Sequence, residues 1–421
     1  MKINIIGGGP SGLYFAILMK RLSRSHEITL LERDAPDDTF GWGIVFSDQT
    51  FSYLQENDPV SFKKITNACQ RWDNVDVIHK DQTVTIRGNN FSGISRLEFL
   101  NILHKRCADL GVEIRFNTNV TDLTEFAECD LLVGADGANS LVRQTFRDAL
   151  KPTVELGKNK YIWLGTRQLF HGLTLIFRQH EAGLFIAHAY KFDDSTSTFI
   201  VECSEATWRN ARFDWRTDPE TLQYLADVFK NELGGRRLLG NDFVRWLNFP
   251  LVRNGRWHHK NVVLLGDAAH TAHFSIGSGT KLALEDAIAL AKCFKGKPDV
   301  RTALEEFQKN RKPVVDEYQD AARSSLLFFE NAEEEMHLEP IPFAYKLMTR
   351  SKKIDHAKLK QRDPEFVAAY DRWARRQKSG RHRSEVRGQK SEVRSPRSKG
   401  HESMTKSQKS AMRPRTKSRN R

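Results

Sequence analysis

A glycine-rich turn near the amino terminus constrains the fold of this chain more than any other feature of its sequence. Residues 3–6 form a short run rich in β-branched side chains, the sequence GGGPSG follows directly, and residues 11–22 then have a helical pattern. A second strand-like run occupies residues 28–31. This order of elements predicts a β-α-β unit whose first turn is made of glycine.

The glycines have the spacing of a dinucleotide-binding turn. Gly7 permits the tight turn, Gly9 lets a pyrophosphate approach the backbone, and Gly12 lets the helix lie close to the strand. Pro10 and Ser11 open the helix, whose free N–H groups would face the phosphates. We therefore expect these five residues to contact a dinucleotide.

Glu32 closes the second strand of this unit, 20 residues beyond Gly12. An acidic side chain at that position can accept hydrogen bonds from a ribose, and a solvated charge at a strand end is the alternative. Arg33 follows it and is predicted to contact the same nucleotide.

The basic charge of the chain is confined to its last residues. The formal net charge is +13, but residues 375–421 contain seventeen Lys or Arg and three acidic residues, so the remainder carries a net charge of −1. This tail is nearly free of large apolar side chains and is predicted to be disordered, because it cannot bury enough surface to offset its ordering entropy. Its charge predicts weak, salt-dependent binding to polyanions and no specific recognition of nucleic acid.

Two later segments resemble known fingerprints. DGANSLVR and GDAAH, in this order, resemble those of the para-hydroxybenzoate hydroxylase class of FAD-dependent monooxygenases. The resemblance implies that Asp136 and Gly137 lie beside the FAD pyrophosphate and a nicotinamide approach path. It also implies that Gly266 and Asp267 contact the ribityl chain. Considered alone, Asp136 is a turn residue and Asp267 is a helix N-cap.

Arg96 and two further glycines complete the FAD contacts that we expect. By the same resemblance Arg96, at the head of a helical pattern, meets phosphate or ribityl oxygens. Gly277 and Gly279 precede another helical pattern, where backbone N–H groups can approach the flavin ring and stabilise negative charge on its reduced form.

The resemblance implies an α/β fold in which a Rossmann-like FAD-binding domain carries an inserted antiparallel-sheet substrate domain. Apolar runs between residues 161 and 203, separated by turn-like residues, predict that sheet. Helical patterns cover residues 96–110, 219–233, 280–294 and 301–329, and short strand-like runs cover 112–116, 131–133 and 262–265. We assign residues 1–70, 95–155 and 255–300 to the FAD-binding domain, 71–94 and 156–254 to the sheet domain, 301–374 to a helical region and 375–421 to the tail.

A closer resemblance covers roughly residues 1–370. FGWGIVFSDQT, FSGISR, NKYIWLGTRQLF and GDAAHTAHFSIGSGTKLALEDA are similar to the hydroxylase region of the 2-aminobenzoyl-CoA monooxygenases and salicylyl-CoA 5-hydroxylases. Several of these segments also resemble the tryptophan hydroxylases of violacein biosynthesis. The implied activity is hydroxylation of an aromatic ring with dioxygen and NADH or NADPH. Since the sequence contains no second glycine motif of the dinucleotide-binding type, we expect the nicotinamide to visit the FAD-binding domain transiently.

The resemblance favours an amino- or hydroxybenzoyl-CoA thioester as the substrate. A tryptophan- or indole-derived compound or a free aromatic acid is the first alternative. A flavin reductase of the same fold is the second, and a catalytically silent flavoprotein whose tail binds polyanions is the third.

Several side chains are candidates for acid–base work on an activated ring, which benefits from a nearby base or hydrogen-bond acceptor. They are His273, His188 and Tyr190, with Tyr161 as a further candidate. For each residue alone, a packing role is the alternative. The reaction requires no metal site and no nucleophilic triad, and we expect neither.

Coenzyme A carries several phosphate charges, so cationic side chains are expected at the mouth of the substrate pocket. Arg167, Arg178 and Lys191 lie in the predicted sheet and are our candidates, with a solvated sheet face as the alternative. No leader-like or membrane-spanning run is recognised, which favours a cytoplasmic monomer or homodimer.

Overall fold

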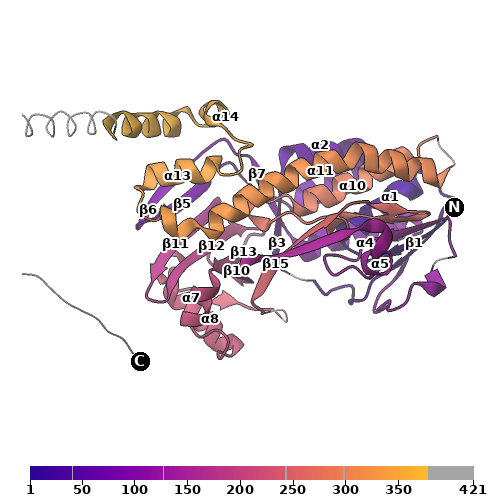
Figure 1. Cartoon of the computed structure of the whole chain (residues 1–421), viewed down its shortest axis with the longest axis horizontal. Helices are drawn as coiled ribbons and strands as arrows, with labels where there is room; N and C mark the ends of the chain where they lie inside the picture. The colour runs from indigo at the N-terminus through magenta and orange to yellow at the C-terminus, as the bar shows by residue number, and fades with distance from the viewer. Residues whose placement is uncertain (40, 127, 242–243, 297–298, 378–421) are drawn as a thin grey trace, which may run out of the picture. The chain divides into compact units, whose positions relative to one another are not determined.

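The computed structural model describes residues 1–377 except residues 40, 127, 242–243 and 297–298 (Figure 1). Met1–Tyr370 form one compact unit and Asp371–Arg421 form a second. Of the second unit only residues 371–377 are described, and they are helical. Most of the predicted disordered tail, residues 375–421, therefore lies outside the described residues.

A mainly parallel sheet is the centre of the nucleotide-binding half of the first unit. Its strand order is β16-β17-β9-β1-β2-β8, and only β16 and β17 are antiparallel neighbours. Its apolar side chains are buried, as expected for a sheet covered on both faces. The strands are β1 Lys2–Ile6, β2 Glu27–Leu31, β8 Glu113–Arg115, β9 Leu131–Gly134, β16 His258–His259 and β17 Val262–Leu264.

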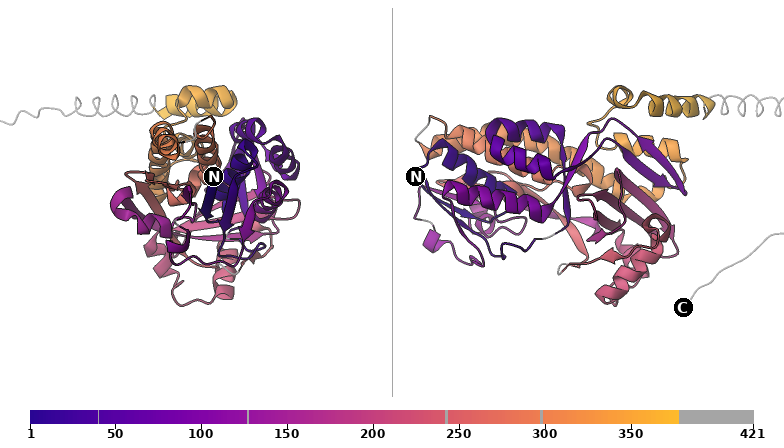
Figure 2. Two further views of the ribbon diagram at one scale, coloured as in Figure 1. Left: turned by 90° about the vertical axis from the view of Figure 1, so that its right-hand side faces the viewer. Right: turned by 180° about the vertical axis from the view of Figure 1, so that it is seen from behind.

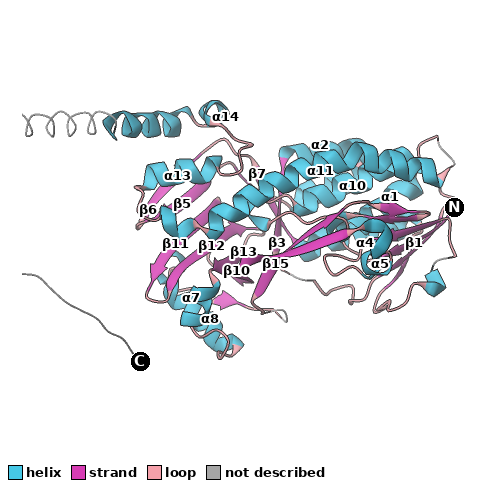
Figure 3. Cartoon of the chain, in the orientation of Figure 1, coloured by secondary structure: helices cyan, strands magenta, loops and turns pink. Residues whose placement is uncertain are grey.

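Helices that begin at predicted positions pack beside this sheet (Figure 3). α1 (Pro10–Leu22) contacts both α4 (Arg96–Leu110) and α10 (Gly279–Cys293). The Ser95 hydroxyl accepts a hydrogen bond from the N–H of Glu98 and caps α4, and Gly111, with φ of 75°, ends it. The short helices α5 (Leu141–Thr145) and α6 (Arg147–Leu150) follow β9.

The second sheet has the strand order β14-β10-β13-β12-β11-β5-β6, and β15 also pairs with β10. The predicted antiparallel sheet is confirmed with one exception, because β5 and β11 are parallel. The strands are β5 Val75–His79, β6 Gln82–Ile86, β10 Pro152–Thr166, β11 Leu173–His180, β12 Gly183–Lys191, β13 Ser197–Cys203, β14 Leu238–Leu239 and β15 Leu247–Asn254.

β10 and β15 form a ribbon that joins the two halves of this unit (Figure 1). The ribbon begins where Pro152 pairs with Asn254, and it ends within the second sheet. At the first end, the Asn254 amide donates to the carbonyl oxygen of Ala269 at 2.6 Å. This contact ties the ribbon to the segment that follows β17.

Several elements differ from the sequence-based expectations. The predicted single helix at residues 219–233 is wrong, because Phe229 leaves the helical region and separates α8 (Asp218–Val228) from α9 (Lys230–Leu233). A small sheet and two helices were not predicted; they lie between β2 and β5, except that one strand follows β6. They are β3 Gly43–Ser47, β4 Gln70–Trp72, β7 Phe91–Ser95, α2 Asp48–Asn57 and α3 Pro59–Ala68.

The long helix α11 (Val300–Glu330) passes from one half of the unit to the other (Figure 2). Near its start, Phe307 packs on Trp257, and near its end Phe329 packs on Phe177 of β11. No helix in the described part of the chain is long and apolar enough to cross a membrane. The remaining elements are η1 Thr124–Phe126, α7 Glu205–Asn210, η2 Gly266–Ala268, η3 Phe274–Ile276, α12 Ala332–Glu335, α13 Pro340–Thr349 and α14 His356–Arg362.

Candidate active site

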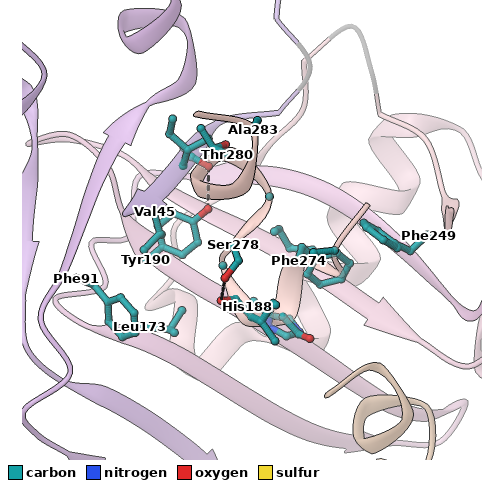
Figure 4. Close-up of a pocket in the computed structure, with 18 of the residues that line it drawn as sticks. Val45, Phe91, Leu173, His188, Tyr190, Phe249, Phe274, Ser278, Thr280 and Ala283 are labelled. Atoms are coloured by element: carbon teal, nitrogen blue, oxygen red, sulfur yellow. Dashed lines mark hydrogen bonds between the residues drawn. The ribbon is translucent and has the colours of Figure 1, made fainter. Parts of the chain in front are cut away.

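A cavity of about 400 Å³ lies where the carboxyl ends of β1, β9 and β17 meet the second sheet. Ligands of open α/β sheets bind at this edge. One end is lined by glycine turns and charged side chains, and the other by apolar and aromatic side chains (Figure 4).

In the glycine turn after β1, some residues line the cavity and others pack against neighbouring backbone. Gly9, Pro10 and Ser11 line the cavity, and a Cβ on Gly9 would have no heavy atom within 4 Å. A Cβ on Gly12 would lie only 2.3 Å from the carbonyl oxygen of Gly7. Gly7 itself has φ of 106° and lies against Ala135. The turn therefore holds the amino terminus of α1 open toward the cavity.

Glu32 lies against the glycine turn. Its carboxylate accepts hydrogen bonds from the N–H of Gly8 at 2.6 Å and of Asp34 at 3.0 Å. The neighbouring Arg33 pairs with Asp34 and is not brought to the cavity. The predicted nucleotide contact of Arg33 thus has no support in this geometry, whereas Glu32 is held beside the phosphate turn.

Two opposite charges face the cavity beyond this turn. Arg96 lines the cavity and donates through Nε to the Thr39 hydroxyl at 3.1 Å. Asp267 also lines it, and its carboxylate has no hydrogen-bond partner within the described part of the chain. Burial raises the pKa of Asp267, an effect that the nearby His270 and Arg96 oppose. Asp267 is therefore not acting as a helix N-cap.

Of the two DGANSLVR residues that were predicted to lie beside FAD, only one lies at the cavity. Gly137 lines the cavity with φ of 79°. Asp136 turns inward and accepts a hydrogen bond from the N–H of Val142 at 3.1 Å. Burial raises the pKa of Asp136. Gly266, with φ of 57°, packs against Ser11.

A second glycine-containing turn forms the cavity wall at the start of α10. Gly277 and Gly279 line the cavity, and a Cβ on either would have no heavy atom within 4 Å. Gly277 is in the left-handed region, with φ of 60°. The amino terminus of α10 therefore also faces the cavity, so that backbone N–H groups are available to a ring system there.

An apolar chamber lies under the second sheet. Leu173, Ile200, Phe249 and Phe274 line it, together with Tyr190, as Figure 4 shows in part. The Tyr190 hydroxyl donates to the carbonyl oxygen of Gly43 at 2.8 Å, and burial raises its pKa. This hydroxyl is therefore engaged by the backbone.

Tyr161 does not line the chamber. It packs on Phe249 and Phe274 behind the wall, and burial raises its pKa to about 12. Of the two tyrosines considered for acid–base work, only Tyr190 reaches the cavity.

The two candidate histidines occupy different positions. His188 of β12 lines the cavity, whereas His273 lies behind the wall and bonds through Nδ1 to the Ser275 hydroxyl at 2.7 Å. Burial lowers the pKa of His273 well below its usual range. Glu202 lies between them, with carboxylate oxygens 3.5 Å from His188 Nε2 and 4.0 Å from His273 Nε2.

Glu202 was not among the predicted residues. The available signal was a charged residue inside the apolar run STFIVEC, every residue of which is buried. A buried carboxylate in a central strand requires a partner, which makes such a residue a candidate for a functional site.

The predicted cations of the pocket mouth are wrong. Arg178 forms ion pairs with Asp81 and Glu232, Arg167 donates to the Ser195 hydroxyl, and neither lines the cavity. Lys191 does not line it either. The basic side chains at the apolar end come instead from the segment after α13, which no sequence signal marked: Arg350 and Arg362.

These features fit an extended dinucleotide with a flat ring. Two helix amino termini and four glycines without neighbours at Cβ offer backbone N–H groups, and Arg96 and Asp267 offer a donor and an acceptor between them. FAD requires such contacts along its phosphates, ribityl chain and ring.

Comparisons with known proteins agree with this geometry. Residues 1–322 match the FAD binding domain family. The chain is 40% identical over 384 residues to the salicyloyl-CoA 5-hydroxylase of Streptomyces sp., a match that covers 89% of this chain and 74% of that protein. It is 36% identical over 359 residues to the protodeoxyviolaceinate monooxygenase of Chromobacterium violaceum, covering 84% and 95%.

Among solved structures, the tetrameric form of 2-methyl-3-hydroxypyridine-5-carboxylic acid oxygenase is similar. The TM-score is 0.66 at 19% identity, covering 86% of this chain and 95% of that one. This likeness confirms the predicted fold, an FAD-binding domain with an inserted sheet. The chain belongs to the FAD-binding family of aromatic-ring monooxygenases, and FAD is its cofactor.

Proposed function

We propose that this enzyme hydroxylates the ring of an amino- or hydroxybenzoyl thioester of coenzyme A, with NADH or NADPH and dioxygen as co-substrates. The observation that carries this proposal is the 40% identity to a salicyloyl-CoA hydroxylase over most of both chains. The cavity supports it, because an apolar chamber suits a ring and Arg362 at its far end suits a phosphorylated tail.

In this proposal the glycine turns hold the cofactor. Gly9 and Ser11 leave room for the pyrophosphate at the amino terminus of α1. Arg96 and Asp267 would contact the ribityl chain, and Glu32, which follows the end of β2, would contact the ribose. Gly277 and Gly279 let backbone N–H groups meet the flavin ring.

The apolar chamber then positions the substrate ring and excludes water. When bound and reduced, FAD supplies the activated oxygen that an electron-rich ring carbon accepts. Leu173, Ile200 and Phe274 bury the ring, and a ring amino or hydroxyl group keeps it nucleophilic although the thioester withdraws electrons. The protein contributes position, desolvation and a base.

A substrate panel tests the proposal. The purified yellow enzyme is mixed with salicyloyl-CoA, 2-aminobenzoyl-CoA, benzoyl-CoA, the free acids and tryptophan, and nicotinamide oxidation is compared with product measured by mass spectrometry. Substituted aryl thioesters should give product, while benzoyl-CoA should give mainly hydrogen peroxide. Efficient hydroxylation of a free acid or tryptophan, with none of any thioester, would refute the thioester assignment.

A second candidate substrate is an indole-derived compound. The 36% identity to protodeoxyviolaceinate monooxygenase, which this chain covers almost completely, favours it. The same panel, extended with indole-containing acids, separates the two, because an indole acid carries no phosphates and its KM should depend on ionic strength less than that of a CoA thioester.

A further inference from the structure

A buried carboxylate lies directly behind the substrate chamber. Glu202 of β13 is 1% exposed, and it lies on the same sheet face as His188 of β12. His188 pairs with Ile200 in the antiparallel register, so Glu202 is its diagonal neighbour. Glu202 Oε1 lies 3.5 Å from His188 Nε2.

These two atoms have no other hydrogen-bond partner within the described residues. Burying a carboxylate without a full set of partners is unfavourable, and it persists where the surrounding structure or the function requires it. The 3.5 Å separation brings the imidazole of His188 within reach of this carboxylate.

Two ionisable groups lie near His188, and a third interacts with both of them. Glu202 faces His188 from β13 and His273 faces it from the segment after β17, while Arg350, from the segment after α13, interacts with Glu202 and His273. α11 presents Phe329, and η3 presents Phe274, against the imidazole ring.

The guanidinium of Arg350 already donates hydrogen bonds to neighbouring residues, one of which lies in the loop before α10. It donates to the carbonyl oxygen of Ser275 at 2.7 Å, to the Ser325 hydroxyl at 2.8 Å and to the carbonyl oxygen of Leu347 at 2.6 Å. No hydrogen bond joins it to Glu202 in the described part of the chain. Its donors therefore do not occupy that carboxylate.

His188 is the candidate base that the geometry leaves available. His273 is behind the wall, with Nδ1 bonded to Ser275, and the Tyr190 hydroxyl is bound to the carbonyl oxygen of Gly43. His188 lines the cavity with Nε2 toward Glu202, so Nδ1 is the nitrogen left for a ligand.

We propose that Glu202 positions His188 and that His188 Nδ1 accepts the proton of the substrate's ring hydroxyl as the ring is hydroxylated. The O–H bond breaks, its electron pair remains on the ring oxygen and increases electron density at the ring carbon, and an N–H bond forms. Nε2–H donates to Glu202, which fixes the tautomer and stabilises the imidazolium, so Glu202 is a positioning residue. This inference rests on the proposed function because it requires a hydroxylated ring.

Kinetics of holoenzyme variants provide the first test. The variants are His188→Gln, Glu202→Gln, Glu202→Asp and the double variant of the two Gln changes, each first shown to retain stoichiometric FAD. With salicyloyl-CoA, His188→Gln should lower kcat by about 100-fold and Glu202→Gln by about tenfold. Glu202→Asp, which keeps the charge, should recover part of that loss. In the His188→Gln background, Glu202→Gln should cause no further loss.

The pH profile separates positioning from a structural role. A protonated base cannot accept a proton, so kcat of the wild type falls on the acidic side. Without the carboxylate charge the imidazolium is less stable, so Glu202→Gln should move that acidic limb to lower pH. An unmoved limb, or an equal Glu202→Gln loss with and without His188, would overturn the proposal and leave Glu202 as a counter-charge for Arg350.

A binding measurement makes the test independent of turnover. Ultraviolet difference titration of salicyloyl-CoA on the oxidised holoenzyme follows ionisation of the ring hydroxyl, and 2-methoxybenzoyl-CoA is the control that has no such proton. The wild type should ionise the bound hydroxyl at lower pH than in solution, and His188→Gln should abolish this shift. Equal titrations in both proteins would refute the role of His188. Failure of the thioester to bind wild type would instead refute the proposed substrate, and the best phenolic compound of the panel would replace it.

Discussion

At the residue scale, two glycines of one turn serve different physical purposes. A side chain on Gly12 would collide with the backbone of Gly7, whereas one on Gly9 would project into open cavity space. The first glycine is required by the protein's own packing and the second only by a ligand.

This difference predicts opposite outcomes for two matched variants. Gly9→Val should abolish FAD retention and leave the Tm of the apoprotein unchanged. Gly12→Val should lower the Tm of the apoprotein itself, because backbone atoms at 2.3 Å cannot move aside cheaply. Flavin absorbance and thermal unfolding of both apoproteins check this; stoichiometric FAD in Gly9→Val would contradict the assignment of the turn.

The buried carboxyl group of Asp267 leads us to expect that the stability of the apoprotein depends on pH. Because burial raises its pKa in the folded state, the unfolded chain loses this proton more readily, and stability falls as pH rises above the unfolded value of 3.8. Asp267→Asn removes this effect. The Tm gain of the variant should be near zero at pH 4 and positive at pH 8, while its FAD affinity should decrease. Equal Tm differences at both pH values would contradict this account.

Which of these residues the sequence could predict depends on how local their cause is. Gly9, Gly12 and Glu32 belong to one β-α-β unit, so their roles follow from spacing along about 30 residues. Arg350 lines the cavity and Glu202 lies behind its wall only because the segment after α13 and β13 converge there. The order of the strands in the sheet decides which residues converge at the cavity, and the periodicity of apolar residues along the chain does not reveal that order.

At the element scale, α10 and α11 are joined by a buried ion pair cluster. Arg311 of α11 donates through Nε to Asp286 at 2.7 Å and lies 3.0 Å from Glu285, both of α10. Asp286 also accepts from His270 of the GDAAH segment at 2.7 Å. Despite burial, His270 and Arg311 hold the pKa of Asp286 below its usual range.

Removing the cation should therefore destabilise the protein strongly. Arg311→Met removes the cation shared by two buried carboxylates, and among the described residues Asp286 keeps only His270 and Glu285 keeps only Lys281 as an ionisable partner. We expect the free energy of unfolding to fall by about 3 kcal/mol. Lys312→Ala on the same helix breaks a partly exposed pair with Asp316 and should change it by less than about 1 kcal/mol. Urea unfolding of both apoproteins measures the contrast. A similar small change in both would mean that α10 and α11 do not depend on this cluster.

The position of α14 at the cavity predicts that one of its side chains contributes to the binding of the substrate's phosphates. Arg362 lines the cavity and Lys360, two residues earlier, does not. Arg362→Ala should raise the KM for salicyloyl-CoA by about two- to fivefold with kcat unchanged, as expected for an exposed ion pair with phosphate. Lys360→Ala is the matched control. A phosphate-free thioester, such as that of N-acetylcysteamine, should show no such difference, and an equal effect on it would contradict phosphate binding.

Elements with a strong local signal were predicted well, and those set by tertiary packing were not. α4 follows from its capping serine and terminal glycine. α8 and α9 have one continuous helical pattern, yet buried Phe229 breaks it. The parallel pairing of β5 with β11 joins strands that are about 100 residues apart, so no local pattern marks it.

At the scale of the whole molecule, nearly all of the chemistry lies in Met1–Tyr370 and nearly all of the excess charge lies in the tail. Truncation after Ala374 should leave FAD content and kcat unchanged, because no residue of the cavity wall is removed. It should abolish retention on heparin at low salt. A large loss of kcat would show that the tail takes part in turnover.

The sheet of the nucleotide-binding half takes strands from the beginning and from the later part of the chain, and six strands of the second sheet, β10 to β15, lie between β9 and β17 in the sequence. During synthesis, β17 and then the start of α10 must therefore leave the ribosome before this sheet and the ligand site beside it can be completed. Until then β1 has its partner β2 but lacks a completed ligand site, so flavin is captured late in synthesis. Nascent chains that end before residue 280 should emerge without bound FAD, and chaperones would meet them as apoprotein.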